Sequence, residues 1–169
     1  MTQAPEQLNG LDLMNFMVQQ EEQTAALYRE IASNAKMGDG FFDRLAEDED
    51  RHRDIYAALV RRFEKETDSS FHQPVSEEDY HYLQSFVEND PLKDHDDYIK
   101  DASKIGDRMD IYNLAIRLEQ ETVALVTELK RLYQDVLPGE FDVIISEEKK
   151  HLQQVRQRRY DYGISGRGL

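Results

Sequence analysis

Apolar residues recur every three or four positions along four long stretches of the chain, the spacing that places them on one face of an α-helix. Polar residues that cap helices stand at two of the starts, as Asn9 with Asp12 and Asp107 with Asp110. The sequence therefore predicts four long helices, at about residues 9–35, 41–66, 107–136 and 140–160.

The connections between these helices differ greatly in length. The first and last are short turns, KMGDG and LPGE, whereas the middle one contains the loop TDSSFHQPVS and then a short helix capped by Ser76 with Asp79. Two helical hairpins joined by a long crossover that carries a short helix form an all-α, ferritin-like four-helix bundle. We expect a single ferritin-like domain at residues 1–162 and a flexible tail at residues 163–169.

Composition and charge narrow the function classes. The 169 residues contain no cysteine, which excludes disulfides and cysteine-ligated zinc or iron. The net charge of −14 argues against nucleic acid, because phosphate binding needs clustered lysine and arginine. No apolar run is long enough for a membrane span, and no signal peptide is evident at the N-terminus, so we expect a cytoplasmic protein.

Each long helix carries one glutamate in the middle of its apolar heptad seam. The second helix has the seam Phe42, Leu45, Glu49, His52, Tyr56, Leu59, Phe63, and the fourth has Phe141, Ile144, Glu148, His151, Val155. The first and third helices carry Glu21 and Glu119 at the corresponding places, and neither has a histidine there. Bundle cores follow this seam, so these polar side chains are predicted to be inside.

The two halves of the chain are related in sequence. The stretch EEQTAALYREI (21–31) aligns with EQETVALVTEL (119–129), and DRLAEDEDRH aligns with DVIISEEKKH, at offsets of 98 and 99 residues. In each hairpin the turn lies near the midpoint between the two glutamates, so all four are expected at one height. A repeat that preserves buried polar residues indicates a site with pseudo-twofold symmetry.

Four carboxylates at one level of a bundle interior are costly unless they are protonated, paired or bound to metal. The central layers contain no lysine or arginine, and two divalent cations would neutralise the four charges. In each Glu-x-x-His pair both side chains lie on one helix face and can reach one ion. The predicted metal ligands are therefore Glu21, Glu49, His52, Glu119, Glu148 and His151. Oxygen and nitrogen donors suit iron, manganese or zinc.

Several other residues near this pattern are not predicted to be metal ligands. Tyr28, one heptad after Glu21, is either core packing or a residue beside the metal with a redox role. A third Glu-x-x-His match, Glu78 to His81, lies on the crossover helix without a repeated partner and is expected to bind nothing. In EDEDRHRD (47–54), the six residues other than Glu49 and His52 are expected to be solvated, with Glu47 and Arg51 spaced for a weak pair.

On Glu21 with Tyr28, AEDEDRH (46–52), Glu119 and SEEKKH (146–151), the chain resembles the ferritin-like di-iron superfamily over roughly residues 8–162. The resemblance is closest to rubrerythrin-like proteins that lack a rubredoxin domain. It implies a carboxylate-bridged pair of iron ions, with Glu49 and Glu119 among the ligands or bridges, and oxidation of Fe(II) by peroxide or O₂.

The chain also departs from the family pattern. The further ligand glutamate that rubrerythrins have one turn after the third-helix glutamate is Thr122 here, and Asp50 stands where bacterioferritins have a haem-binding methionine. With no cysteine-ligated iron domain, peroxidase turnover implies an external electron donor.

Three functions remain open from the sequence. The leading one is a redox enzyme that reduces peroxide or O₂ in defence against oxidative stress. The second is an iron storage or transfer protein with ferroxidase activity, and the third is a non-enzymatic interaction bundle stapled by metal. A homodimer is expected, because a bundle with exposed apolar flanks tends to pair.

Overall fold

The computed structural model describes residues 8–34, 37, 39–135 and 139–166. The four long helices are α1 (Gly10–Ser33), α2 (Phe41–Lys65), α5 (Arg108–Tyr133) and α6 (Glu140–Ser165). The crossover between α2 and α5 carries η1 (Ser70–His72), α3 (Glu77–Glu88), α4 (Asp96–Lys100) and η2 (Ala102–Ile105). The described residues form no strand, which confirms the all-α, ferritin-like bundle.

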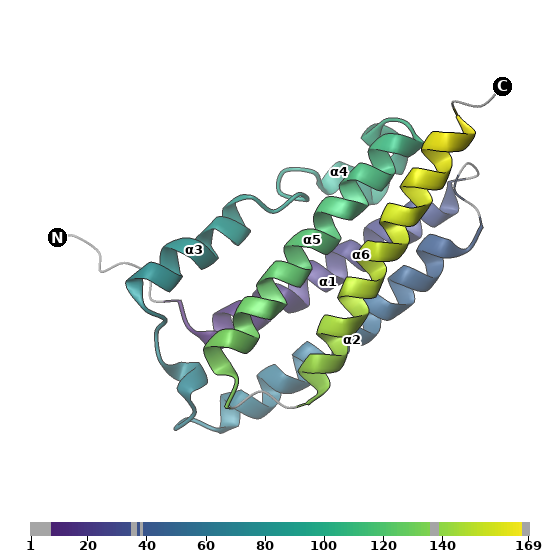
Figure 1. Cartoon of the computed structure of the whole chain (residues 1–169). Helices are drawn as coiled ribbons and strands as arrows, with labels where there is room; N and C mark the ends of the chain where they lie inside the picture. The colour runs from purple at the N-terminus through teal and green to yellow at the C-terminus, as the bar shows by residue number, and fades with distance from the viewer. Residues whose placement is uncertain (1–7, 35–36, 38, 136–138, 167–169) are drawn as a thin grey trace.

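The bundle consists of two antiparallel hairpins, α1 with α2 and α5 with α6 (Figure 1). The helices α2 and α5 run in the same direction, so the chain must return along the whole bundle between them. The crossover does this, with α3 lying near the start of α1 and α4 lying near the start of α5 (Figure 1). The crossover contains more helical segments than predicted, since α4, η1 and η2 accompany the expected short helix.

The helix starts agree closely with the capping signals in the sequence. Asn9 and Asp12 form a capping box at the start of α1, and Asp107 and Asp110 form another at the start of α5. Ser76 accepts a hydrogen bond from the backbone N–H of Asp79 at the start of α3. These side chains satisfy backbone donors that have no partner within the helix.

The helix ends agree less well. The helix α5 ends at Tyr133, and the predicted ends at residues 35 and 136 lie outside the described residues. The predicted end of the fourth helix at Tyr160 was wrong, because α6 continues to Ser165 and takes in residues assigned to the tail. A tertiary contact explains the extension: the ring of Tyr162 packs 6.0 Å from that of Tyr112 on α5. Residues 167–169 lie outside the described part.

Two apolar clusters fill the bundle and leave a polar layer between them. One, which includes Leu13, Met14, Phe63 and Ile144, lies toward the α1 N-terminus, and the other, which includes Ile31, Phe42 and Val155, lies toward the opposite end. The layer between the clusters contains the six predicted metal ligands, each at most 2% exposed. The heptad seam therefore placed these six side chains inside, as expected.

The crossover is held against the first cluster by an aromatic stack. The ring of Phe71 in η1 lies 4.3 Å from that of Phe63 on α2 and 4.3 Å from that of Tyr133 on α5. The first residue of α1, Gly10, lies directly against this stack. Among the helices formed by described residues, none is long and apolar enough to cross a membrane.

Candidate metal centre

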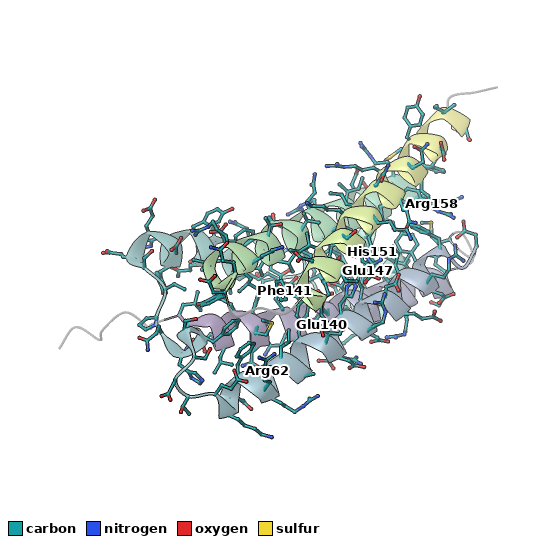
Figure 2. All side chains as sticks on the ribbon, turned by 60° about the horizontal axis from the view of Figure 1, so that its bottom comes forward. Arg62, Glu140, Phe141, Glu147, His151 and Arg158 are labelled. Atoms are coloured by element: carbon teal, nitrogen blue, oxygen red, sulfur yellow. The ribbon has the colours of Figure 1, made fainter. Side chains whose placement is uncertain are left out.

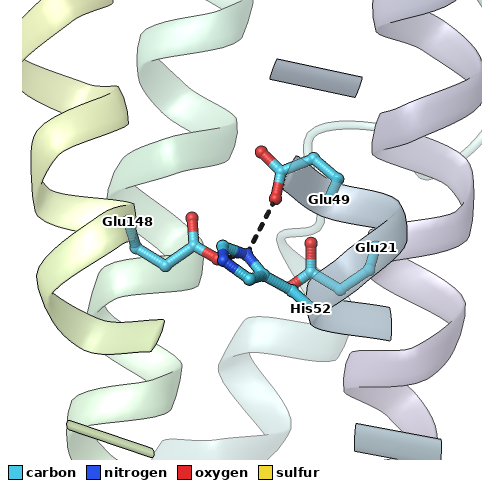
Figure 3. A group of neighbouring side chains, drawn as sticks. All are labelled: Glu21, Glu49, His52 and Glu148. Atoms are coloured by element: carbon cyan, nitrogen blue, oxygen red, sulfur yellow. Dashed lines mark hydrogen bonds and ion pairs between the residues drawn. The ribbon is translucent and has the colours of Figure 1, made fainter. Parts of the chain in front are cut away.

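All four long helices contribute to the polar layer. Glu21 comes from α1, Glu119 from α5, and one Glu-x-x-His pair from each of α2 and α6. Their donor atoms form two groups of four, within each of which all atoms lie within 4.8 Å of one another. The groups are Glu21, Glu49, His52, Glu148 and Glu49, Glu119, Glu148, His151. Figure 3 shows the first group converging from α1, α2 and α6.

Glu49 and Glu148 belong to both groups. A carboxylate has two oxygens, so each of these residues can give one oxygen to each of two ions and bridge them. Glu21 with His52 would then complete one ion's ligands, and Glu119 with His151 the other's. Glu119, which the resemblance placed among the ligands or bridges, belongs to a single group.

Unsatisfied buried atoms show that this layer fits a metal pair. Eight buried side-chain nitrogen or oxygen atoms lack a hydrogen-bond partner in the described part of the chain, and six of them belong to predicted ligands. They are Glu21 Oε1, Glu49 Oε1, Glu119 Oε2, both oxygens of Glu148, and His151 Nδ1. Buried polar atoms are normally satisfied, so such a concentration at one level fits side chains that could hold metal ions.

The inner nitrogens of both histidines face carboxylates. His52 Nδ1 lies 2.6 Å from Glu148 Oε1 and 3.2 Å from Glu49 Oε2. His151 Nδ1 lies 3.3 Å from Glu49 Oε1 and 3.6 Å from Glu148 Oε2. Burial alone would lower both pKa values, but these carboxylates outweigh it and raise the pKa of His52 to about 10 and that of His151 to about 12. Without metal, both rings therefore hold an extra proton at neutral pH.

The carboxylates are affected in opposite directions. Burial raises the pKa of Glu21 well above its usual value, and the charges of Glu148 and Glu49 add to the effect. Burial and the same two charges also raise the pKa of Glu119. For Glu49 burial is outweighed by His151 and His52, which lower its pKa to about 2. The metal-free layer thus balances its buried charge with protons.

A second layer of acids holds the outer nitrogens of the histidines. His52 Nε2 lies 2.9 Å from Glu147 on α6, and His151 Nε2 lies 3.1 Å from Asp48 on α2. Arg51 lies between these two acids, 2.9 Å from Glu147 and 2.8 Å from Asp48. An acid on the outer nitrogen of a ligand histidine keeps a proton there and turns the inner nitrogen toward the metal.

This second layer was not predicted from the sequence. Asp48 and Arg51 are solvated as expected, but the predicted pair of Glu47 with Arg51 was wrong, because Arg51 binds Asp48 and Glu147 instead. One signal was available: Asp48 and Glu147 occupy equivalent places in the internal repeat, each just before a seam glutamate. The pairing crosses from α2 to α6, and no spacing within one helix reveals it.

Two buried tyrosines lie against the layer. The Tyr28 hydroxyl donates a hydrogen bond to Glu119, which places this residue beside the predicted ligands. The hydroxyl of Tyr56, assigned only to the seam, is fully buried and has no hydrogen-bond partner among the described residues. Burial, followed by the charges of Glu21, Glu148 and Glu49, raises its pKa well above the usual value. Burial, followed by the charge of Glu119, also raises the pKa of Tyr28, so both phenols are held neutral near the carboxylates.

The remaining histidines lie away from the layer. His81 on α3 is exposed, the ring of His95 stacks on that of Tyr98, and His72 Nε2 lies 2.7 Å from the Phe63 carbonyl. None of the three belongs to a metal-holding group formed by described residues.

Comparison with known proteins agrees with the geometry. The model of the rubrerythrin family matches residues 12–158, most of the chain and all six predicted ligands. The chain belongs to the rubrerythrin family. No curated protein and no solved structure matches it. In this rubrerythrin-family chain the buried carboxylate and histidine cluster fits a di-iron site.

Proposed function

We propose that this rubrerythrin-family chain is an oxidoreductase that holds two iron ions between its hairpins and uses them to reduce peroxide or O₂. The observation that carries the proposal is the pair of four-residue groups that share Glu49 and Glu148 in an apolar interior. When bound, iron would supply the electron chemistry, since reduction of one H₂O₂ to two water molecules needs two protons and two electrons, one from each Fe(II).

The chain's own residues would position the ions and balance their charge. Four carboxylates supply four negative charges, which match two divalent cations, and two neutral imidazoles complete the ligands. The acids Asp48 and Glu147 would keep both imidazoles oriented. The neutral phenol of Tyr28 can supply a proton or an electron at Glu119, which supports the role foreseen for this residue.

The proposal also includes an external electron donor for the iron ions. The chain contains no cysteine with which to bind a second, electron-supplying iron, so return to Fe(II) calls for an external electron donor. A role in oxidative-stress defence, a cytoplasmic location and a homodimer complete the proposal.

The experiment is anaerobic loading with Fe(II), followed by rapid mixing with peroxide and measurement of Fe(III) absorbance. We expect oxidation of two ions per chain, and loss of the fast phase in Glu49→Ala and in Glu148→Ala. Glu78→Ala, which removes the glutamate of the exposed Glu-x-x-His match, is the matched control. Circular dichroism checks that each variant is folded. Oxidation at the unaltered rate in folded Glu49→Ala and Glu148→Ala would refute the proposal, and uptake of many ions per chain would favour iron storage.

A further inference from the structure

A large groove opens between the hairpins, outside the metal layer. It has a volume of about 960 Å³ and is lined by α2, the start of α5, and α6 from Glu147 to Ser165. His151 and the acids of the second layer are among its lining residues. Figure 2 shows Glu147, His151 and Arg158 following one another along α6, the helix that forms one wall. We call this feature the α2–α6 groove.

The α2–α6 groove is basic, although the chain as a whole carries a net charge of −14. Its cationic side chains are Arg44, Arg51, Arg108, Lys150 and Arg158. Three carboxylates also line it, and two of these, Asp48 and Glu147, are bound by Arg51. Arg158 is paired with Asp39, so the remaining three cations face only Asp161 within the groove, and the charge there is positive.

Three of these cations form no ion pair with any described residue: Arg44, Arg108 and Lys150. In addition, Arg108 Nε is buried without a hydrogen-bond acceptor among these residues. The guanidinium of Arg108 lies 4.9 Å from the centre of the Tyr162 ring, within the range of a cation–π contact. Because Nε itself is buried, an anion in the groove would meet the other nitrogens of this guanidinium, which form charge-assisted hydrogen bonds with phosphate oxygens.

The groove's size and chemistry favour one class of ligand. Small-molecule sites have volumes of about 300–1,000 Å³, and the groove is at the upper end of that range. Arginine forks match the oxygens of a phosphate, and Tyr112 and Tyr162 offer ring surface to an aromatic group. We propose that the α2–α6 groove binds a phosphomonoester of mononucleotide size.

The acidity of the rest of the molecule favours a small ligand over an acidic protein. At physiological salt, charges more than about 8 Å apart are largely screened, so a dianion inside the groove interacts mainly with the lining cations. An acidic protein would bring its charges against the acidic surface around the groove as well. The metal ions take no part in this reasoning, so the binding proposal stands or falls separately from peroxide reduction.

The test uses adenosine monophosphate and flavin mononucleotide as probes and inorganic phosphate as a competitor. Binding is measured by calorimetry and by quenching of flavin fluorescence. We expect saturable binding of at least one mononucleotide, competition by phosphate, and weaker binding at 0.5 M salt than at ~0.05 M. Arg108→Gln and Lys150→Gln should each raise Kd by about tenfold, because each removes a charge-assisted hydrogen bond.

Lys149→Gln is the matched control, because Lys149 is the sequence neighbour of Lys150 and is exposed on α6 outside the groove. Unaltered Kd in Lys149→Gln together with the losses above supports the proposal. Absence of mononucleotide binding at millimolar concentration, or equal Kd values in all variants, would overturn it. Binding of polyglutamate without binding of either mononucleotide would also overturn it and would indicate an acidic protein partner.

Discussion

Loading the metal centre with two divalent ions should release protons. The inner nitrogens of His52 and His151 belong to the two predicted ligand groups, and a nitrogen that binds metal cannot keep its proton. Their outer nitrogens keep theirs, because Glu147 and Asp48 accept from them. Each histidine should therefore lose one proton, from the nitrogen that faces the carboxylates.

The size of the effect follows from the raised pKa values. The pKa of His52, about 10, lies roughly three units above a solution pH of 7. The pKa of His151, about 12, lies roughly five units above it. At 1.36 kcal/mol per unit, removing these protons costs about 4 and about 7 kcal/mol, which metal binding must supply. Glu21 and Glu119, whose pKa values are also raised, can release up to two more protons. The release should thus be two to four protons per chain.

The proton release also determines how metal affinity depends on pH. Low pH favours the metal-free protein, which holds the protons, so apparent affinity should rise with pH. Both histidine pKa values lie above pH 8, so two protons are displaced throughout the range from pH 6 to 8. The apparent constant for binding the ion pair should therefore change by at least about 100-fold per pH unit.

The assay adds Zn²⁺, which undergoes no redox change, to metal-free protein in unbuffered solution with a pH indicator. Calorimetry in two buffers of different ionisation enthalpy gives an independent count. His151→Gln should lower the release by about one proton, and His81→Gln, which alters the exposed histidine of α3, should not change it. Release of less than one proton per chain, or affinity independent of pH, would refute this account of the centre.

Three substitutions test other parts of the structure. Glu147→Gln should weaken metal binding by about 10–100-fold by loosening the histidine that it orients, whereas Glu47→Gln on the exposed face should leave it unchanged; equal affinities would contradict the second layer. Tyr28→Phe should slow peroxide reduction and lower the free energy of unfolding by about 1–3 kcal/mol, because its carboxylate acceptor loses a buried donor; an unaltered rate would remove this residue from the chemistry. Gly10→Ala should lower the unfolding free energy by about 1–3 kcal/mol in urea titrations, because the added Cβ would lie 2.5 Å from Phe71; unchanged stability would show that the aromatic stack shifts freely.

Much of the centre was visible in the sequence for a local reason. A side chain's face and its height along a helix follow from residue number alone, since each residue adds about 1.5 Å of rise and 100° of rotation. The seam of α2 therefore showed that Glu49 and His52 are inside, and the repeat showed the same for Glu148 and His151. The capping pairs at Asn9 and Asp107 located two helix starts by the same local chemistry.

Features that depend on the distance between helices could not be seen in this way. The α2 to α6 contacts of Asp48 and Glu147 with the histidines join residues about a hundred positions apart. The end of α6 at Ser165 depends on packing of Tyr162 against α5, which overrides Gly163 in the last turn. Local propensity cannot report either contact.

The sequence by itself determined four amphipathic helices, their pairing into hairpins, and one buried carboxylate on each, because helical periodicity is a property of the chain. Only the tertiary structure decided that Glu49 and Glu148 are the shared pair, that Arg51 links the two outer acids, and that a basic groove lies between α2 and α6. The physical reason is that the rotation and separation of packed helices come from side chains meeting across them, and these set which donor atoms converge.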